Sequence, residues 1–461
     1  MKKLPLLIWT LFATFCLYGQ DVNPVDFMKM NPYQLNSNPA TNLKYYSYAA
    51  LGTNNICLNI HNSSLRYDNC FQFDAEGRPS VFDLNKLAAS LKENNNLSVN
   101  ANVEIFGMGR RSRYGFIHYG HRVRVQSSIA YGDDLFELAA YGNSAFQGDD
   151  NPADIKLNVN LLAYQEFAVG YQIKPTENLS VGARLKFLLG TAQANTDAFS
   201  IRLFTNPQTY ALRIYEDVAM RAAGVPSLGL GPNGTLGGRF NPGDLFHNPG
   251  FGVDLAAEYD LDEHYSVMAA VNDLGFIRWK FNSLSFTGAV SDEGQFYESG
   301  SFFYDGLDVD QLQRLVSDGD YREQFMDTLK QYFKINSEFI QPYNTMLHTN
   351  ILLRGTYRLN DTHRFMAQLQ GYCSGVGFRP AMTLAYNATF MEMFDICASY
   401  SMMKGSLANL GLGLAGNFGA FHIYFATNNL ISALRPLNSN GLNAELGIVF
   451  NIRHANNSYF E

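Results

Sequence analysis

Residues 179–190, which read LSVGARLKFLLG, contain the pattern that decides the fold. Successive side chains of a β-strand point to opposite faces. Leu185 and Phe187 therefore share one face with other apolar residues, and Arg184 and Lys186 share the other. The alternation runs along the whole segment, and a strand needs about 9–11 residues to cross a membrane. The segment predicts a strand of a transmembrane barrel, with its apolar face toward lipid and its charges toward a watery interior.

The same alternation recurs along the chain, most clearly in residues 117–129, 251–259, 364–373 and 442–453. Strands of ordinary globular sheets average about 5–6 residues, and these segments are longer. Short polar turns such as residues 175–178 join neighbouring segments, as expected for hairpins. We predict an all-β fold, a transmembrane antiparallel β-barrel of about 14 strands with short helical and loop insertions.

Composition supports this prediction. Charged residues make up 16% of the 461 residues, whereas about 25% is usual for soluble domains. Aromatic residues make up 14%, and the chain has 43 Asn and 39 Gly. The net charge of −8 argues against a nucleic-acid partner, since nucleic-acid binders are usually basic. After residue 20 there is no apolar run long enough for a spanning helix.

The N-terminus predicts export. Lys2 and Lys3 precede an apolar stretch, and the small residue Gly19 stands near a plausible cleavage point. This is the pattern of a cleaved signal peptide at residues 1–20. Residues 21–461 would then form the barrel, and we expect it in the cell outer membrane with lipid as its surroundings.

Three stretches break the strand pattern. Residues 80–93 and 308–335 show helical spacing of apolar residues, which predicts helical insertions. Residues 217–250 are rich in Gly and Pro, which predicts a loop insertion. Each could form an outer loop or enter the barrel interior.

No motif indicates catalysis or a cofactor. The two GxGxxG matches, at residues 229–234 and 411–416, lack the strand-to-helix context of a dinucleotide site. His118 and His121 are three residues apart, which places them on opposite faces of a strand. We predict no catalytic residue, no metal, no cofactor and no enzymatic activity. Cys57, Cys70, Cys373 and Cys397 show no metal-ligand spacing, and we favour unpaired thiols over disulfides.

Charged residues on the polar faces of the strands are the candidate functional residues. They could line a pore that screens solutes by charge, or form an ion-paired network that fills the interior. We favour the network, because charges inside a plugged barrel need partners; Glu104 and Glu445 are further candidate counter-charges. Trp279 is predicted to lie in an aromatic girdle at the membrane interface. The lumen-lining candidates are Arg122, Arg124, Arg184, Lys186, Asp254, Glu258, Arg354, Arg358 and Arg364.

Several blocks of the chain resemble a known family. They are Asn31-Pro32, Asn38-Pro39-Ala40, residues 179–187, residues 250–259, residues 271–279 (VNDLGFIRW) and residues 438–452. Together they resemble the uncharacterised outer-membrane β-barrel family of Bacteroidota, a domain of unknown function. The chain is more distantly similar to fatty-acid-transporter barrels and to barrels associated with type IX secretion. The resemblance implies about 14 strands and an N-terminal segment that enters the lumen, and it supplies no catalytic or binding residues.

Two functions follow as expectations. The first is an outer-membrane transporter or channel for small molecules, hydrophobic solutes included. The alternative is a structural or secretion-linked barrel that binds envelope proteins. An outer-membrane hydrolase is a third hypothesis, although no sequence motif marks its residues.

Overall fold

The computed structural model describes residues 22–43, 46–64, 66–74, 79–208, 212–224, 243, 246–288, 295–297, 311, 314, 318–321, 324, 335–374, 377–391, 393–403, 406–435 and 439–452. The predicted signal peptide at residues 1–20 lies outside this part of the chain. So does most of the predicted helical insertion at residues 308–335.

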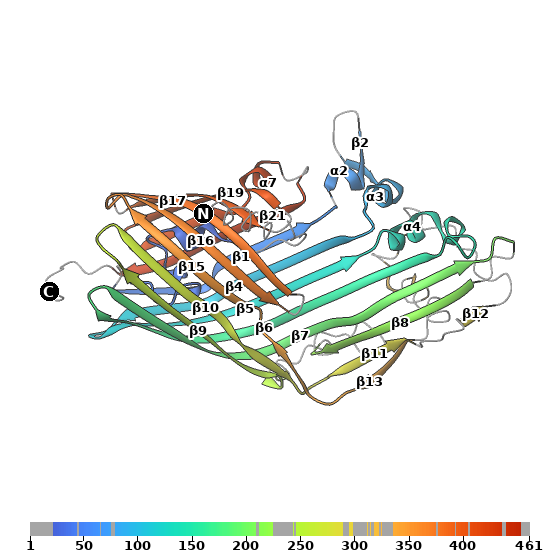
Figure 1. The fold of residues 1–461 in the computed structure, drawn as a ribbon, viewed down its shortest axis with the longest axis horizontal. Helices are drawn as coiled ribbons and strands as arrows, with labels where there is room; N and C mark the ends of the chain where they lie inside the picture. Colours follow the sequence, from blue (N-terminus) through green and yellow to red (C-terminus); the bar gives the residue numbers. More distant parts are fainter. Residues whose placement is uncertain are drawn as a thin grey trace, which may run out of the picture.

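Fourteen strands of the described chain form a closed antiparallel ring (Figure 1). The ring closes because β1 pairs with β4 on one side and with β21 on the other, so that Leu58 lies opposite both Ala101 and Ala444. This confirms the predicted barrel and its strand number. The ring consists of β1 (Ser47–Asn62), β4 (Asn95–Arg111), β5 (Gly115–Tyr131), β6 (Ala153–Thr176), β7 (Leu179–Thr205), β9 (Pro249–Asp260), β10 (Tyr265–Trp279), β15 (Thr349–Arg358), β16 (His363–Ser374), β17 (Gly377–Phe390), β18 (Phe394–Met403), β19 (Ser406–Phe418), β20 (Phe421–Thr427) and β21 (Gly441–Ile452).

Beyond the ring, strands β4 to β7 continue into an extension of the wall (Figure 1). The N-terminal part of β7, Leu179 to Leu189, pairs with β9. Its C-terminal part, Gln193 to Thr205, pairs with β8 (Leu212–Ala223). Short strands β11 (Leu284–Gly288), β12 (Gln295–Tyr297), β13 (Ile335–Phe339) and β14 (Tyr343–Met346) add to this end. Small elements complete the described chain: α2 (Tyr67–Cys70), β2 (Phe71–Phe73), β3 (Pro79–Phe82), α3 (Leu84–Ser90), α4 (Asp134–Tyr141), η3 (Asn143–Ala145) and α7 (Leu430–Leu434).

Two predicted insertions differ in extent from the structure. The helix expected over residues 80–93 is the shorter α3, which begins after Asp83, whose side chain accepts a hydrogen bond from the Lys86 backbone N–H at 2.9 Å. The prediction of a loop over residues 217–250 is wrong for the first residues of that range, because β8 extends to Ala223. Pairing with β7 and β11 holds these residues extended. Residues 225–242 lie outside the described chain.

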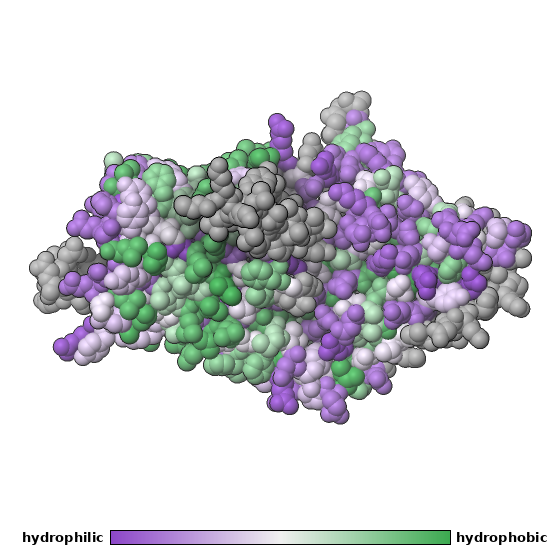
Figure 2. Space-filling model, viewed as in Figure 1, coloured by the Kyte–Doolittle hydropathy of each residue, from purple (hydrophilic) through white to green (hydrophobic). Residues whose placement is uncertain are grey.

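The wall distributes its residues in the opposite way to a soluble protein. Arg184 and Lys186 are each 1% exposed, whereas Leu185 is 57% exposed. Figure 2 shows apolar residues gathered over the ring and hydrophilic residues over the extension. We call the outward-facing set the apolar belt, and every strand of the ring contributes to it at exposures between 39% and 57%. One member from each strand is Ile56, Met108, Ile117, Val169, Leu185, Leu255, Val267, Leu353, Leu369, Leu384, Ile396, Leu414, Ile423 and Leu446.

Trp279 does not lie in an outward girdle, so that prediction was wrong. Its side chain is fully buried, packs in a cluster with Tyr164 and Leu188, and donates a hydrogen bond to Thr345 Oγ1 at 3.1 Å. A Cβ at Gly190 would overlap the indole ring, so this glycine makes room for it. Strand β14 pairs beside the end of β10 and covers the site.

None of the described helices is long and apolar enough to span a membrane. Cys57, Cys70, Cys373 and Cys397 are not joined in disulfides, as the sequence predicts.

The closure of the ring predicts a specific cross-link. In a background without other cysteines, Leu58→Cys with Ala444→Cys should form a disulfide, because directly opposed strand residues lie within disulfide reach. The cross-link joins distant parts of the chain, so the boiled, unreduced protein should migrate faster on an SDS gel. Ala444→Cys with Leu384→Cys on β17 is the matched control and should not cross-link. Equal cross-linking of both pairs would contradict the ring order.

Candidate functional site

The N-terminal residues 22–43 occupy the barrel lumen, and we call them the lumen segment. It forms two short 3₁₀ helices, η1 (Pro24–Phe27) and η2 (Pro32–Asn36), and pairs with no described strand. Each helix begins with an Asn-Pro pair. The side chains of Asn23 and Asn31 accept hydrogen bonds from the backbone two residues on, and a proline at the first helical position has the required φ angle.

One side of the lumen segment is apolar. Phe27 and Met28 are fully buried in a cluster with wall residues that are small or apolar, among them Ala385, Cys397 and Ala415. A Cβ at Gly413 would lie 2.8 Å from the Met28 sulfur. The small residues of β17 to β19 therefore accept the first half of the segment, among buried polar residues such as Asp395, which accepts a hydrogen bond from the Met30 backbone N–H at 3.1 Å.

Strands β10, β15 and β16, of which β16 pairs with β17, hold the segment with polar contacts to its backbone. Arg354 Nη1 donates to the Asp26 carbonyl and Arg364 Nη2 donates to the Phe27 carbonyl, each at 2.8 Å. Asn272 Nδ2 donates to the Ser37 carbonyl at 2.8 Å. Because these bonds end on main-chain oxygens, they fix the path of the segment more than the identity of its side chains. Burial raises the pKa of the Asp26 carboxyl, against the opposing influence of nearby Arg354.

A buried group of charges stands beside the segment, and we call it the charge cluster. It has four cations from β5 and β7 and three carboxylates from β6, β9 and β10. Glu166 contacts all four cations: Arg122, Arg124 at 3.2 Å, Arg184 at 3.3 Å and Lys186 at 3.8 Å. Lys186 Nζ lies 2.6 Å from both Asp254 and Asp273. Arg124 also contacts Asp273 at 2.8 Å, and Arg184 contacts Asp254 at 3.4 Å.

The cluster contacts the lumen segment through Arg184, whose Nη1 donates to the carbonyl oxygens of Leu35 and Asn36 at 3.5 and 3.3 Å. A further buried carboxylate, Glu104 of β4, lies opposite Arg122 beside the cluster. Buried charges are stable only when each finds partners, because desolvation costs several kcal/mol per ion. The end of η2 therefore supplies two of the acceptors that surround Arg184.

The nine lumen-lining candidates fall into three groups. Five belong to the charge cluster: Arg122, Arg124, Arg184, Lys186 and Asp254. Three contact the lumen segment: Arg354, Arg364 and Glu258, whose carboxylate accepts from Asn38 Nδ2 at 3.1 Å. The last, Arg358, is not brought to these groups, and pairs with Asp260 at 2.7 Å near the end of its strand.

Two carboxylates of the cluster were not selected from the sequence. Glu166 lies in the regular alternation of β6, directly opposite Arg122, so a register argument could have found it. Asp273 could not have been found that way. Its φ of 60° and the register shift between Val271 and Leu274 turn it inward, where its backbone N–H donates to Asp254 at 2.7 Å. Such a bulge interrupts the period on which the prediction rests.

A small polar cavity of about 170 Å³ remains between the lumen segment and the charge cluster. Tyr33, Asn102, Gln126 and Asp273 are among the residues around it. The volume is below the range of about 300–1,000 Å³ usual for ligand sites. Among the described residues, no group of three or more His, Cys, Asp or Glu side chains could hold a metal ion.

These features define a closed antiparallel barrel with an apolar exterior and a lumen filled by its own N-terminal segment. The chain belongs to a family described as "Family of unknown function (DUF5723)", which matches residues 39–428. A search of curated proteins finds no match.

Solved structures with a similar fold include the toluene transporter TodX of Pseudomonas putida, at 10% identity over 94% of this chain and 97% of that one, with a TM-score of 0.41. The toluene transporter TbuX of Ralstonia pickettii has 10% identity over 93% and 97%, with a TM-score of 0.42. A FadL homologue of Pseudomonas aeruginosa has 11% identity over 91% and 93%, with a TM-score of 0.38. At these values the similarities carry no argument about function.

Removal of the central carboxylate should destabilise the barrel. Glu166→Ala removes the carboxylate that contacts all four cations of the cluster, and breaking a buried pair costs about 3–5 kcal/mol. Denaturant titration of the purified protein, followed by the gel shift of the folded barrel, measures the change. Asp149→Ala is the control, because its carboxylate is 79% exposed and its pair with Arg213 should contribute about 1 kcal/mol or less. Equal losses in both variants would refute the structural role of the cluster.

Proposed function

We propose that this protein is an outer-membrane barrel that lets small molecules, hydrophobic solutes included, cross the membrane when the lumen segment moves. The membrane location is supported by the closed ring and the apolar belt. In lipid every backbone group needs a partner, and a closed barrel leaves no unpaired edge. We infer that the ring spans the bilayer and that the hydrophilic extension lies outside it.

The observation that carries the proposal is the way the lumen is closed. The lumen segment shares no strand pairing with the wall, so it can leave without breaking the ring. Its polar anchors are side-chain hydrogen bonds, which contribute about 1 kcal/mol net from Asn272 and about 1.5–3 kcal/mol each from the charged Arg354 and Arg364. Separating two wall strands would instead expose many backbone groups to lipid at several kcal/mol each. Movement of the segment is therefore the less costly way to open a path.

The residues on the two sides of the lumen support small uncharged molecules, hydrophobic solutes included, as the transported class. Once the segment moves, β17 to β19 would line one side of the path with small residues such as Ala385 and Ala415, interspersed with polar residues such as Ser401. The charge cluster stays ion-paired on the other side and keeps few charges available to a solute. We infer that the nine lumen-lining candidates position the segment and stiffen the wall rather than select ions. That the protein is not an enzyme stays a prediction.

Locking the lumen segment should stop transport. The variant Ser37→Cys with Asn272→Cys, in a background without other cysteines, places one thiol on each of the two residues that the hydrogen bond from Asn272 Nδ2 to the Ser37 carbonyl joins at 2.8 Å. Bacterial cells producing this variant should take up radiolabelled oleate and toluene about tenfold more slowly when oxidised, because the open state can no longer be populated. Reduction should restore uptake, and each single cysteine variant should be indifferent to oxidant. Equal uptake by the oxidised and reduced double variant would show that the segment is not the gate.

The extension favours a second candidate, a barrel that binds envelope proteins. Its strands and helix α4 lie beyond the apolar belt (Figures 1 and 2). Transport across the bilayer alone does not require protein structure in that region. Helix α4 packs on the extension through Leu135 and Leu138 and leaves Tyr141 40% exposed.

A photo-crosslinking amino acid at Tyr141 tests this candidate in cells. We expect a discrete adduct with an envelope protein from position 141 and none from Val267, an exposed belt residue that should face lipid. The same adducts from both positions, or none from position 141, would count against a partner-binding role for the extension.

A further inference from the structure

The edge of the apolar belt that borders the extension carries a row of large apolar side chains. Phe251 of β9 lies directly opposite Phe187 of β7 on one side and opposite Phe276 of β10 on the other. Phe276 in turn lies opposite Met346 of β14. The four side chains are between 40% and 62% exposed. Because neighbouring strands are only about 4.8 Å apart, the row is a continuous apolar strip on the outer surface of four adjacent strands.

Two cations follow this row directly along the chain. Phe276, Arg278 and Lys280 are exposed, whereas the residues between them are fully buried, so the three side chains share the outer face. One of the buried residues is Trp279, and its packing inside the wall fixes its two neighbours outward. The buried side chain of Asn248 also accepts a hydrogen bond from the Lys280 backbone N–H at 2.8 Å. The backbone therefore holds both cations beside the apolar row.

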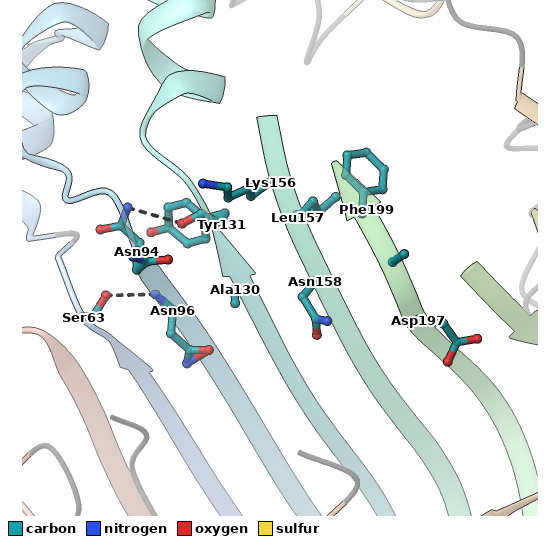
Figure 3. Close-up of a pocket in the computed structure, with 12 residues that line it drawn as sticks. Ser63, Asn94, Asn96, Ala130, Tyr131, Lys156, Leu157, Asn158, Asp197 and Phe199 are labelled. Atoms are coloured by element: carbon teal, nitrogen blue, oxygen red, sulfur yellow. Dashed lines mark hydrogen bonds between the residues drawn. The ribbon is translucent and has the colours of Figure 1, made fainter. Parts of the chain in front are cut away.

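Neither cation has a partner of opposite charge in the described part of the chain. Arg278 and Lys280 form no ion pair with a described carboxylate. By contrast, Lys156, which lies beside the polar cavity of the extension (Figure 3), pairs with Asp154 at 3.0 Å. The exposed Asn344 of β14 lies opposite Arg278 and adds a neutral amide donor. This edge of the belt therefore offers two unneutralised positive charges and an amide to an anionic group.

The lengths of the connections indicate which leaflet of the membrane this edge faces. Outer-membrane barrels have short periplasmic turns and longer extracellular loops. At the end away from the extension, short turns such as residues 112–114 and 261–264 join the ring strands. Long connections, such as residues 63–94 and 280–348, lie on the side of the extension. Given the membrane location proposed above, the extension is outside the cell and Arg278 is at the level of the outer-leaflet headgroups.

We propose that this edge of the belt binds a phosphorylated, multiply acylated glycolipid of the lipid A type. Arg278 and Lys280 bind its phosphate, because guanidinium and ammonium groups form strong charge-assisted hydrogen bonds with phosphate oxygens. Asn344 donates to the same oxygens or to a sugar hydroxyl, and the apolar row contacts the acyl chains. The proposal rests on the membrane location of the ring and not on transport. Failure of the locked lumen segment to stop uptake would therefore leave it intact.

Native mass spectrometry of the full-length protein in a non-ionic detergent tests the proposal. The probes are lipid A, lipid A from which the phosphates have been removed, and phosphatidylglycerol, whose phosphate comes from a phospholipid instead. Titration of each lipid gives the fraction of protein that retains it. We expect lipid A to bind at least about tenfold more tightly than either comparator, because each basic side chain beside a charged lipid surface contributes about fivefold in affinity.

Two double variants locate the binding. Arg278→Gln with Lys280→Gln should weaken the binding of lipid A more than about tenfold, since both charges are lost. Arg110→Gln with Lys156→Gln is the matched control, because it also removes one arginine and one lysine. Arg110 is exposed at the opposite edge of the belt, and Lys156 is an ion-paired residue of the extension. The control should bind lipid A as the unaltered protein does, and the heat-dependent gel shift shows that both variants keep the barrel.

Three outcomes would overturn the proposal. They are no retained lipid A, binding of phosphatidylglycerol or of the dephosphorylated lipid as tight as that of lipid A, and equal loss of binding in the two double variants. Absence of the gel shift in the unaltered protein is a different result, because it would refute the membrane location on which the proposal rests.

Discussion

The pairing of β1 with β21 is the interaction on which the rest of the structure depends. It joins strands from the two ends of the described chain, and it converts a sheet with two open edges into a ring without an edge. Once the ring is closed, one face of every strand points into a confined lumen and the other points outward. The inverted distribution of residues, with Arg184 buried beside an exposed Leu185, makes sense only in that geometry.

The lumen then has to be filled, and two kinds of contact fill it. On the side of β17 to β19, small wall residues accept the apolar part of the lumen segment. On the other side, charged residues pair among themselves and with the segment's carbonyl groups, since neither ion nor carbonyl can be left unpaired when buried. The segment thus fills the lumen of a wall that is continuous without it. This separation between a permanent ring and a side-chain-anchored closure is the physical basis of the transport proposal.

The extension obeys different rules from the ring. Its strands continue those of the wall, but their surfaces are hydrophilic and their inner face is rich in asparagine (Figure 2). Side-chain amides need no counter-ion, in contrast with the charge cluster of the lumen. The two regions therefore differ in chemistry: paired charges lie inside the ring, and neutral polar groups predominate in the extension.

The sequence by itself determined the barrel and its strand number. It also determined which face of segments such as 179–190 carries the charges. These features follow from the alternation of apolar and charged residues, because a period of two is a local property of an extended chain. It also pointed to five members of the charge cluster. Tertiary structure alone decided the rest. The bulge that turns Asp273 inward breaks the period, and Trp279 is buried because β14, distant in sequence, covers it. Which inward charges meet also depends on the stagger of neighbouring strands around the ring. Closure of the whole sheet sets that stagger, so it cannot be read from the sequence of any single strand.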